Sequence, residues 1–245
     1  MTAGLWIEPD WPAPPGVRAL STLRSGGVSR GPFAEFNLAD HVDDDPAAVA
    51  ANRALLRRAA GLPAEPCWLL QVHGRGVIPA GEGPAAGPAD GSWTDRPGRV
   101  CVVLTADCLP VLLARRDGSA VAALHAGWRG LAAGVLEAGV AALGGGAGLV
   151  AWLGPAIGPD HFEVGPEVRD AFLAADAGAA AAFRPAARPG HLLADLYLLA
   201  RQRLARAGVG SVHGGGECTF ADAKRFYSYR RDGVTGRMAT LVWRA

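Results

Sequence analysis

The sequence has few cysteines and no long apolar run, and both shortages limit what the protein can be. Four cysteines in 245 residues are too few for the disulfide framework of a small secreted protein. The start of the chain lacks the basic residues and the apolar run of roughly 7 to 15 residues that a secretory signal needs. No stretch of about 18 uncharged apolar residues is present, as a membrane helix would require. We therefore expect a cytoplasmic protein with reduced thiols and no membrane partner.

The chain also lacks an excess of charge of either sign. Its 24 basic and 23 acidic residues give a formal net charge of +1. A broad electrostatic surface for nucleic acid is therefore not expected. Hydrophobic residues make up 50% of the chain, which is enough to bury a substantial core at this length. A small neutral or locally anionic substrate fits this composition better than a nucleic acid.

Strand and helix signals are interleaved along the chain without strict βαβ alternation. Apolar runs predict strands at 17–23, 67–74, 99–108, 110–118 and 149–158. Helices are expected at 46–61, where Asp45 can cap the first turn, and at 128–143, 166–175 and 193–207. Residues 225–243 are expected to form a hairpin of two extended runs. Several neighbouring strands look antiparallel, so we predict an α+β fold with a mixed sheet flanked by helices, in one domain over residues 1–245.

Three metal-binding side chains share one sequence context. His73, Cys108 and His125 each follow an apolar run and precede a turn that contains Gly or Pro. Two imidazoles and one thiolate suit Zn²⁺, and three protein ligands leave a fourth position open, as in catalytic zinc sites. The gaps of 35 and 17 residues between them match no compact zinc finger. The pattern therefore favours a catalytic metal site at the ends of strands.

The same residues also allow a chemistry without metal. Cys108 could act as a nucleophile with His125 as its base. This arrangement needs a thiol with a lowered pKa. Spacing alone does not separate the two hypotheses, although a second histidine is useful to a metal and unnecessary for a nucleophile and base pair.

Other polar residues are candidates for binding or proton transfer. Arg24 lies beside glycines and serines in STLRSGGVS, a composition that suits an oxyanion such as phosphate. Asp107 could orient a ligand or act as a base, and Asn37 could bond a substrate or cap a turn. The segment SYRRDGVTGR gathers three arginines that form either a solvated turn or an anion site: Arg230, Arg231 and Arg237.

An ordered set of motifs resembles one known family. STLRSGGVS, FNLA, QVHG, TADCLPVLL, HAGWRG, GPAIGPDHFEVG and SYRRDGVTGR occur in the order seen in bacterial laccase-domain proteins. These proteins are also called multicopper polyphenol oxidases or peptidoglycan editing factors, and they are now regarded as purine nucleoside phosphorylases. The resemblance covers residues 17–243, and seven motifs in order are far more specific than any one of them.

The resemblance implies a single α+β domain with a metal site formed by His73, Cys108 and His125. It implies zinc as the cofactor, with copper able to take its place. The implied activities are phosphorolysis of adenosine, inosine, guanosine and methylthioadenosine, and deamination of adenosine. Purine nucleosides and phosphate would be the partners of a monomer or small homo-oligomer. Within this reading, Arg24 is the expected phosphate ligand, Asn37 and Arg230 are further substrate contacts, and Asp107 is the expected proton-transfer group.

Two observations qualify what the resemblance implies. Members of the family often carry cysteine where this chain has Pro159-Asp160-His161. The chain has six histidines and no H-x-H motif, so a multicopper oxidase centre is not expected, and any copper-dependent polyphenol oxidation would come from copper in a zinc site. A cysteine hydrolase acting on peptidoglycan precursors through Cys108 and His125 stays as the alternative function.

Overall fold

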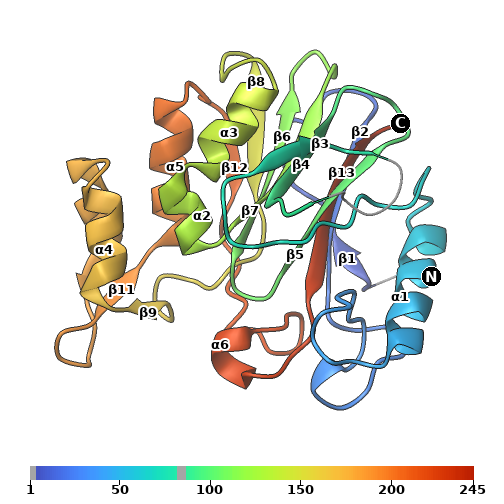
Figure 1. Cartoon of the computed structure of the whole chain (residues 1–245), viewed down its shortest axis with the longest axis horizontal. Coiled ribbons are helices and arrows are strands. Elements are labelled where there is room, and N and C mark those ends of the chain that lie inside the picture. Colours follow the sequence, from blue (N-terminus) through green and yellow to red (C-terminus); the bar gives the residue numbers. More distant parts are fainter. Residues whose placement is uncertain (1–3, 82–86) are drawn as a thin grey trace.

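Two β-sheets pack face to face in the computed structural model, which describes residues 4–81 and 87–245 (Figure 1). The smaller sheet has the order β1 (Trp6–Ile7), β2 (Val17–Thr22), β13 (Met238–Arg244) and β5 (Val100–Thr105). The larger has the order β12 (Val212–Gly214), β8 (Leu149–Leu153), β6 (Leu109–Arg115), β7 (Val121–Ala126), β4 (Gly91–Thr94) and β3 (Val77–Pro79). Neighbouring strands are antiparallel except in the pairs β12–β8 and β3–β4.

Helices cover the outer faces of both sheets. On the four-stranded sheet lies α1 (Pro46–Ala59), and on the six-stranded sheet lie α2 (Trp128–Ala133), α3 (Val135–Ala142) and α5 (Leu196–Arg206). Farther out lie α4 (Pro166–Leu173), the 3₁₀ turn η2 (Ala177–Ala182) and a small sheet of β10 (Phe183–Pro185), β11 (Leu192–Ala194) and β9 (Glu163–Val164). The remaining short elements are the 3₁₀ turn η1 (Gly31–Phe33) and α6 (Tyr229–Asp232). This arrangement confirms the predicted α+β fold with mixed sheets flanked by helices.

Strand β5 shows why the central strands are apolar along their whole length. Cys101 and Val103 point into the core between the two sheets, whereas Val102 and Leu104 point toward the layer that holds α1. Side chains alternate between the two faces of a strand. Because both faces of β5 are covered, both sets of positions must be apolar, and the sequence shows a continuous hydrophobic run rather than alternation.

The predicted helices are present, but one of them is divided into two. The Asp45 side chain accepts a hydrogen bond from Ala47 N–H at 2.9 Å, and Pro46 occupies the first turn of α1 as expected. The predicted helix at 128–143 is instead two helices, because Gly134 has a φ of 99° and ends α2 in the left-handed region. Glycine reaches this conformation at little cost, so the chain changes direction there before α3 begins.

Two predicted strand regions are wrong, for reasons visible in their hydrogen bonds. Residues 67–74 form only isolated bridges and no strand, because their last N–H groups bond a carboxylate rather than a neighbouring strand. Residues 225–243 do not form a hairpin. Ser228 caps the short helix α6 by accepting from Arg231 N–H, and β13 pairs with β2 and β5 instead.

None of the helices in the described part of the chain combines the length and the apolar character that crossing a bilayer requires.

Removing a core side chain from α3 tests the packing of helices on the larger sheet. We expect Leu136→Ala to lower the free energy of unfolding by about 2–5 kcal/mol, because Leu136 is fully buried and its loss leaves a cavity. The matched variant Leu70→Ala changes a leucine that is 63% exposed and should shift stability by about 0.5 kcal/mol or less. Urea denaturation followed by circular dichroism measures both. Equal effects of the two variants would contradict this packing.

Candidate metal site and adjoining groove

His73, Cys108 and His125 come together at one end of the sandwich. Cys108 lies between β5 and β6, His125 is in β7, and His73 is in the loop before β3. Their ligand atoms all lie within 4.8 Å of one another, and Cys108 Sγ is 3.9 Å from His73 Nε2. A tetrahedral zinc with ordinary Zn–S and Zn–N bonds separates sulfur and nitrogen by about 3.6 Å. The three residues therefore fit a tetrahedral metal ion and could hold one.

Asp90 supports two of these ligands at once. Its carboxylate is fully buried and accepts hydrogen bonds from His73 N–H at 2.9 Å and Gly74 N–H at 2.6 Å. One of its oxygens also lies 2.8 Å from His125 Nδ1. Burial works against ionisation, but the hydrogen bonds from His125 and Gly74 outweigh it and lower the pKa of Asp90. An ionised carboxylate only accepts, so His125 donates from Nδ1 and keeps Nε2 free for a ligand bond.

The sequence analysis missed Asp90. It lies in the segment GPADG, whose two glycines and one proline indicate only a loop. A single aspartate before a glycine is an ordinary turn signal. What makes Asp90 special is the return of the loop at 72–74 onto its carboxylate, which no local pattern reveals.

The loop that carries His73 takes an unusual backbone conformation. His73 has a φ of 58°, in the left-handed region that few residues other than glycine adopt. The hydrogen bonds from three consecutive N–H groups to Asp90 hold this conformation. The conformation is therefore maintained by the surrounding contacts, as is common where a side chain must point into a site.

The thiol and the imidazoles influence one another. Burial alone would raise the pKa of Cys108, but the charges and hydrogen bonds of His125 and His73 outweigh it and lower that pKa. Burial alone would lower the pKa of His125, whereas Cys108 and Asp90 raise it. A thiolate at Cys108 is the form that a metal binds and that a nucleophile uses.

Gly127 leaves the space in which the cluster fits. A Cβ atom at this position would lie 3.0 Å from Cys108 Sγ and 3.0 Å from His73 Cδ2. Any other residue would crowd two of the three ligands. The glycine in HAGWRG therefore has a packing reason that the sequence pattern alone does not show.

Asp107 lies beside the cluster and connects it to the C-terminal segment. It has a φ of 88° and is 8% exposed. One carboxylate oxygen accepts from Thr219 Oγ1 at 2.6 Å, and the other accepts from Arg230 N–H at 2.6 Å. Its backbone oxygen accepts from Ile157 N–H at 2.9 Å. The residue before the ligand Cys108 is thus tied to three separate segments.

Arg24 and Asn37 make contacts within the scaffold. The Arg24 guanidinium donates to the backbone oxygens of Ala34 and Ala223 and lies 4.8 Å from the centre of the Tyr227 ring. Asn37 is fully buried, and its side chain bonds backbone groups of Ala39 and Arg237 and the carboxylate of Asp44. These contacts hold the loop around 24–45 against the C-terminal segment.

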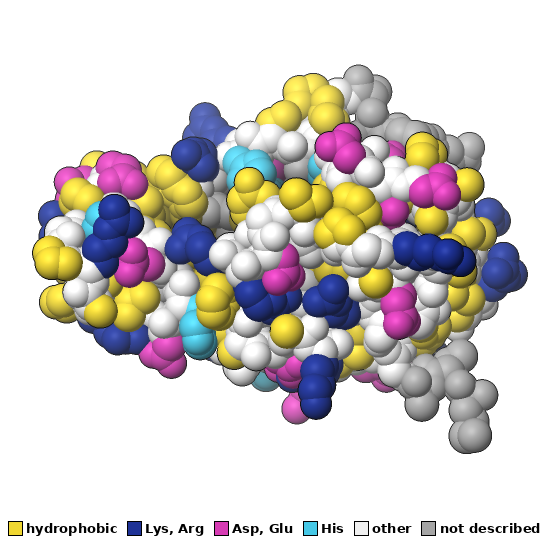
Figure 2. Space-filling model, turned by 90° about the horizontal axis from the view of Figure 1, so that it is seen from below, with side chains coloured by type: hydrophobic (Ala, Val, Ile, Leu, Met, Phe, Trp, Pro, Cys, Tyr) yellow, Lys and Arg dark blue, Asp and Glu magenta, His cyan; other side chains and the backbone are white. Residues whose placement is uncertain are grey.

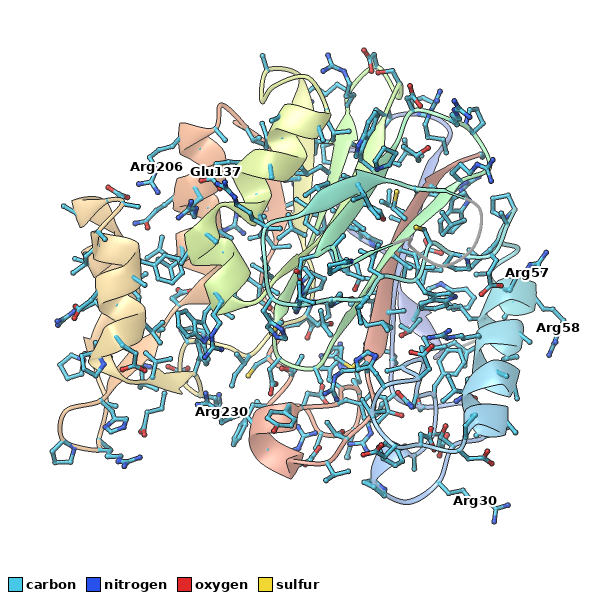
Figure 3. All side chains as sticks on the ribbon, in the orientation of Figure 1. Arg30, Arg57, Arg58, Glu137, Arg206 and Arg230 are labelled. Atoms are coloured by element: carbon cyan, nitrogen blue, oxygen red, sulfur yellow. The ribbon has the colours of Figure 1, made fainter. Side chains whose placement is uncertain are left out.

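A groove of about 490 Å³ lies beside residues that flank the cluster. Trp128 and Arg230 are among its lining residues; Trp128 follows Gly127, and the Arg230 N–H bonds Asp107. Arg129 lies 4.4 Å from the Trp128 ring centre, and Arg230 lies 5.3 Å from the Phe162 ring centre. In Figure 3, Arg230 extends from α6 toward the β9 side. Figure 2 shows basic, histidine and hydrophobic side chains next to one another on the face seen from the α6 side.

The other arginines of the SYRRDGVTGR segment mainly contact backbone. Arg231 donates to the oxygens of Thr219 and Phe220, and Arg237 donates to the oxygens of Thr235 and Gly236. Arg230 also donates to a backbone oxygen, that of Glu163 at 2.7 Å, but of the three arginines it is the one that lines the groove.

Comparison with known proteins gives one consistent result. Residues 18–245 match a family model described as multi-copper polyphenol oxidoreductase laccase. The chain is 59% identical over 239 residues to a Pseudomonas aeruginosa protein named purine nucleoside phosphorylase, covering 97% of this chain and 98% of that protein. It is 53% identical over 239 residues to purine nucleoside phosphorylase YfiH of Escherichia coli, with coverage of 97% and 98%.

Solved structures agree with the fold. Neisseria meningitidis protein NMB0706 superposes with a TM-score of 0.92 at 48% identity, covering 98% of this chain and 99% of that chain. YlmD from Geobacillus stearothermophilus superposes with a TM-score of 0.88 at 28% identity, covering 100% and 97%.

Replacing Asp90 tests its support of the metal ligands. We expect Asp90→Asn to weaken binding of Zn²⁺ by about 10- to 100-fold, because the His125 ring loses its charged partner. Competition with a chromogenic chelator measures the affinity, and circular dichroism checks that the variant is folded. The control Asp95→Asn changes an exposed aspartate near β4 and should bind zinc like the parent protein. A folded Asp90→Asn variant with unchanged affinity would contradict this role.

Proposed function

The chain belongs to the family described as multi-copper polyphenol oxidoreductase laccase, and from this premise we propose that it is a zinc-dependent purine nucleoside phosphorylase. Relatives with up to 59% identity carry the name purine nucleoside phosphorylase. The observation that carries the proposal is the His73, Cys108 and His125 cluster, with a nearby groove whose lining includes three arginines and two glutamates. We propose adenosine, inosine, guanosine and methylthioadenosine as substrates, together with deamination of adenosine.

The donor set favours zinc over a multicopper centre. The cluster combines one thiolate and two imidazoles within 4.8 Å, and the six histidines of the chain contain no H-x-H pair. Zinc with three protein ligands keeps one coordination position open and supplies a Lewis acid. Asp90 fixes the orientation of the His125 ring, and Gly127 leaves room for the ligand atoms. Copper-dependent polyphenol oxidation is the alternative if copper occupies these ligands.

The groove supports binding of phosphate next to the cluster. Arg129 and Arg230 lie near the Trp128 and Phe162 rings. The Arg230 guanidinium donates from Nη1 to the backbone oxygen of Glu163 at 2.7 Å, and its other N–H groups can bond an oxyanion. Phosphorolysis needs phosphate beside the ribose, so we propose that Arg230 binds phosphate. The sequence pattern assigned phosphate binding to Arg24, and we now assign it to Arg230. We propose that Arg24 and Asn37 position the loop around 24–45 against the C-terminal segment.

Asp107 is our candidate for proton transfer during deamination. It precedes Cys108, and each of its two oxygens accepts one hydrogen bond, which leaves further lone pairs for a proton. In zinc deaminases of other types, a carboxylate that does not bind the metal moves the proton. The Thr219 and Arg230 contacts keep the Asp107 carboxylate in place.

A cysteine hydrolase acting on peptidoglycan precursors is the second candidate function. The observation that favours it is the chain of contacts from Cys108 to His125 to Asp90, because a nucleophile, a base and an orienting carboxylate form a hydrolytic triad. His73 is unnecessary to such a triad. Its position within the cluster is why we favour the metal.

We treat residues 1–245 as one functional unit in the form of a monomer or small homo-oligomer. We also propose a cytoplasmic location. The four free cysteines support it, because such thiols persist in reducing compartments.

Incubation with adenosine, with and without phosphate, tests the proposed activity. We expect adenine only when phosphate is present, and inosine regardless of phosphate. His73→Ala and Cys108→Ser should each lower both activities at least about 100-fold, because a metal ligand is lost. Liquid chromatography of the products and elemental analysis of the protein measure the result. Formation of no product from any purine nucleoside would reject the proposed activity, and full activity without metal would reject the zinc dependence. Absence of stoichiometric zinc together with alkylation of Cys108 by iodoacetamide would favour the hydrolase.

Replacing Arg230 tests the phosphate assignment. We expect Arg230→Gln to raise the KM for phosphate about 10- to 100-fold, because a charge-assisted hydrogen bond is worth about 1.5–3 kcal/mol. Deamination of adenosine, which uses no phosphate, should change far less. The control Arg57→Gln alters α1, on the opposite side of the molecule from Arg230 in Figure 3, and should leave the KM unchanged. An unchanged phosphate KM in Arg230→Gln would reject this assignment.

A further inference from the structure

A second cysteine and histidine pair lies outside the metal cluster. Cys218 Sγ is 3.5 Å from His161 Nδ1, although the two residues are 57 positions apart. The His161 ring stacks on Phe220, with ring centres 4.7 Å apart and an interplanar angle of 25°. Because this stacking fixes the ring, the nitrogen stays directed at the sulfur.

Two backbone groups also point at the sulfur. Gly158 N–H donates to Cys218 Sγ at 3.2 Å, and Ala221 N–H donates at 3.4 Å. Hydrogen bonds of this kind stabilise the negative charge that a thiol carries when it reacts as a nucleophile. The imidazole of His161 can receive the proton that the thiol loses. Three polar groups from two loops therefore meet at one sulfur atom.

The pair opens into its own pocket. A pocket of about 480 Å³ is lined by Cys218 and His161, and by residues of the loop at 215–217 and the start of α5. His73, Cys108 and His125 are not among its lining residues. The pocket thus gives small molecules access to Cys218 without passing through the metal cluster.

The other three cysteines are less suited to react. Cys67 and Cys101 are buried, and burial raises the pKa of Cys101 to about 12. Cys108 belongs to the metal cluster, where a bound metal would occupy its sulfur. Cys218 is partly exposed, lies beside His161 and is not part of the metal cluster.

From this arrangement we propose that Cys218 and His161 form a second, thiol-based site at which a hydroperoxide oxidises Cys218 to a sulfenic acid. The sulfur attacks one peroxide oxygen, so that an S–O bond forms as the O–O bond breaks. The thiol proton passes to His161 and then to the leaving oxygen, which departs as water or an alcohol. Sulfur loses two electrons and the peroxide gains them. The proposal does not depend on the nucleoside activity.

The site is connected to the metal cluster by a short path. The residue after Cys218 is Thr219, whose hydroxyl donates to Asp107 Oδ1 at 2.6 Å. Gly158 packs tightly on the cysteine, since a Cβ there would lie 3.1 Å from Cys218 Sγ. Oxidation at Cys218 therefore changes the side chain directly before the residue that bonds Asp107.

Trapping with dimedone tests the site in zinc-saturated protein. We expect hydrogen peroxide followed by dimedone to label Cys218 before the other three cysteines, as identified by peptide mass spectrometry. Cys218→Ser should lose this label. His161→Gln should slow labelling at least about tenfold, because the proton acceptor is lost, whereas His41→Gln, which changes a half-exposed histidine elsewhere, should not.

Two outcomes would overturn the proposal. One is labelling of Cys108 ahead of Cys218 in the zinc-saturated protein. The other is an equal labelling rate in His161→Gln and the parent protein, with circular dichroism showing that both are folded. Since no nucleoside is present, failure of this test is separate from failure of the proposed phosphorylase activity.

Discussion

The buried carboxylate of Asp90 is the group on which the arrangement of the cluster depends. It accepts from the backbone of the loop that carries His73 and from the ring of His125. A buried charge without partners would be very costly, so these hydrogen bonds have to form together. One carboxylate thereby sets the path of the irregular loop and the tautomer of His125 on β7. The loop at 72–74 is irregular because its N–H groups bond this carboxylate instead of a strand.

The two packed sheets bring the remaining parts to the same place. Cys108 lies between β5 of the smaller sheet and β6 of the larger one, so the turn that crosses from one sheet to the other carries the thiol. The hydrogen bonds of Asp107 then connect this turn to α6 and to the loop at 219. Strands and hydrogen-bonded loops together hold the cluster, while the groove and the second pocket are lined by other residues. This is a general way for a fold to keep a site rigid and still accessible.

Much of the fold was predictable because its signals are local. Asp45 and Pro46 start α1 through contacts within one turn, and the apolar run of β5 reflects burial on both faces. The strand predicted at 67–74 was wrong because the distant Asp90 carboxylate bonds its last N–H groups. The hairpin predicted at 225–243 was wrong because Ser228 caps the short helix α6, the Asp107 carboxylate accepts from Arg230 N–H, and β13 pairs with β2 and β5. A run of apolar residues does not show that a side chain, rather than a neighbouring strand, will bond its N–H groups.

By itself, the sequence determined the residue types of the cluster, the positions of Cys108 and His125 near strand ends, the mixed α+β class and the family. Only the tertiary structure decided that Asp90 bonds both the His73 loop and the His125 ring. It also decided that Arg230 lines the groove, that Arg24 bonds backbone oxygens, and that His161 lies beside Cys218. The physical reason is the range of the interactions. Caps, turns and strand periodicity act over a few residues, whereas the partners of a buried carboxylate or of a thiol are set by how two sheets and their loops pack.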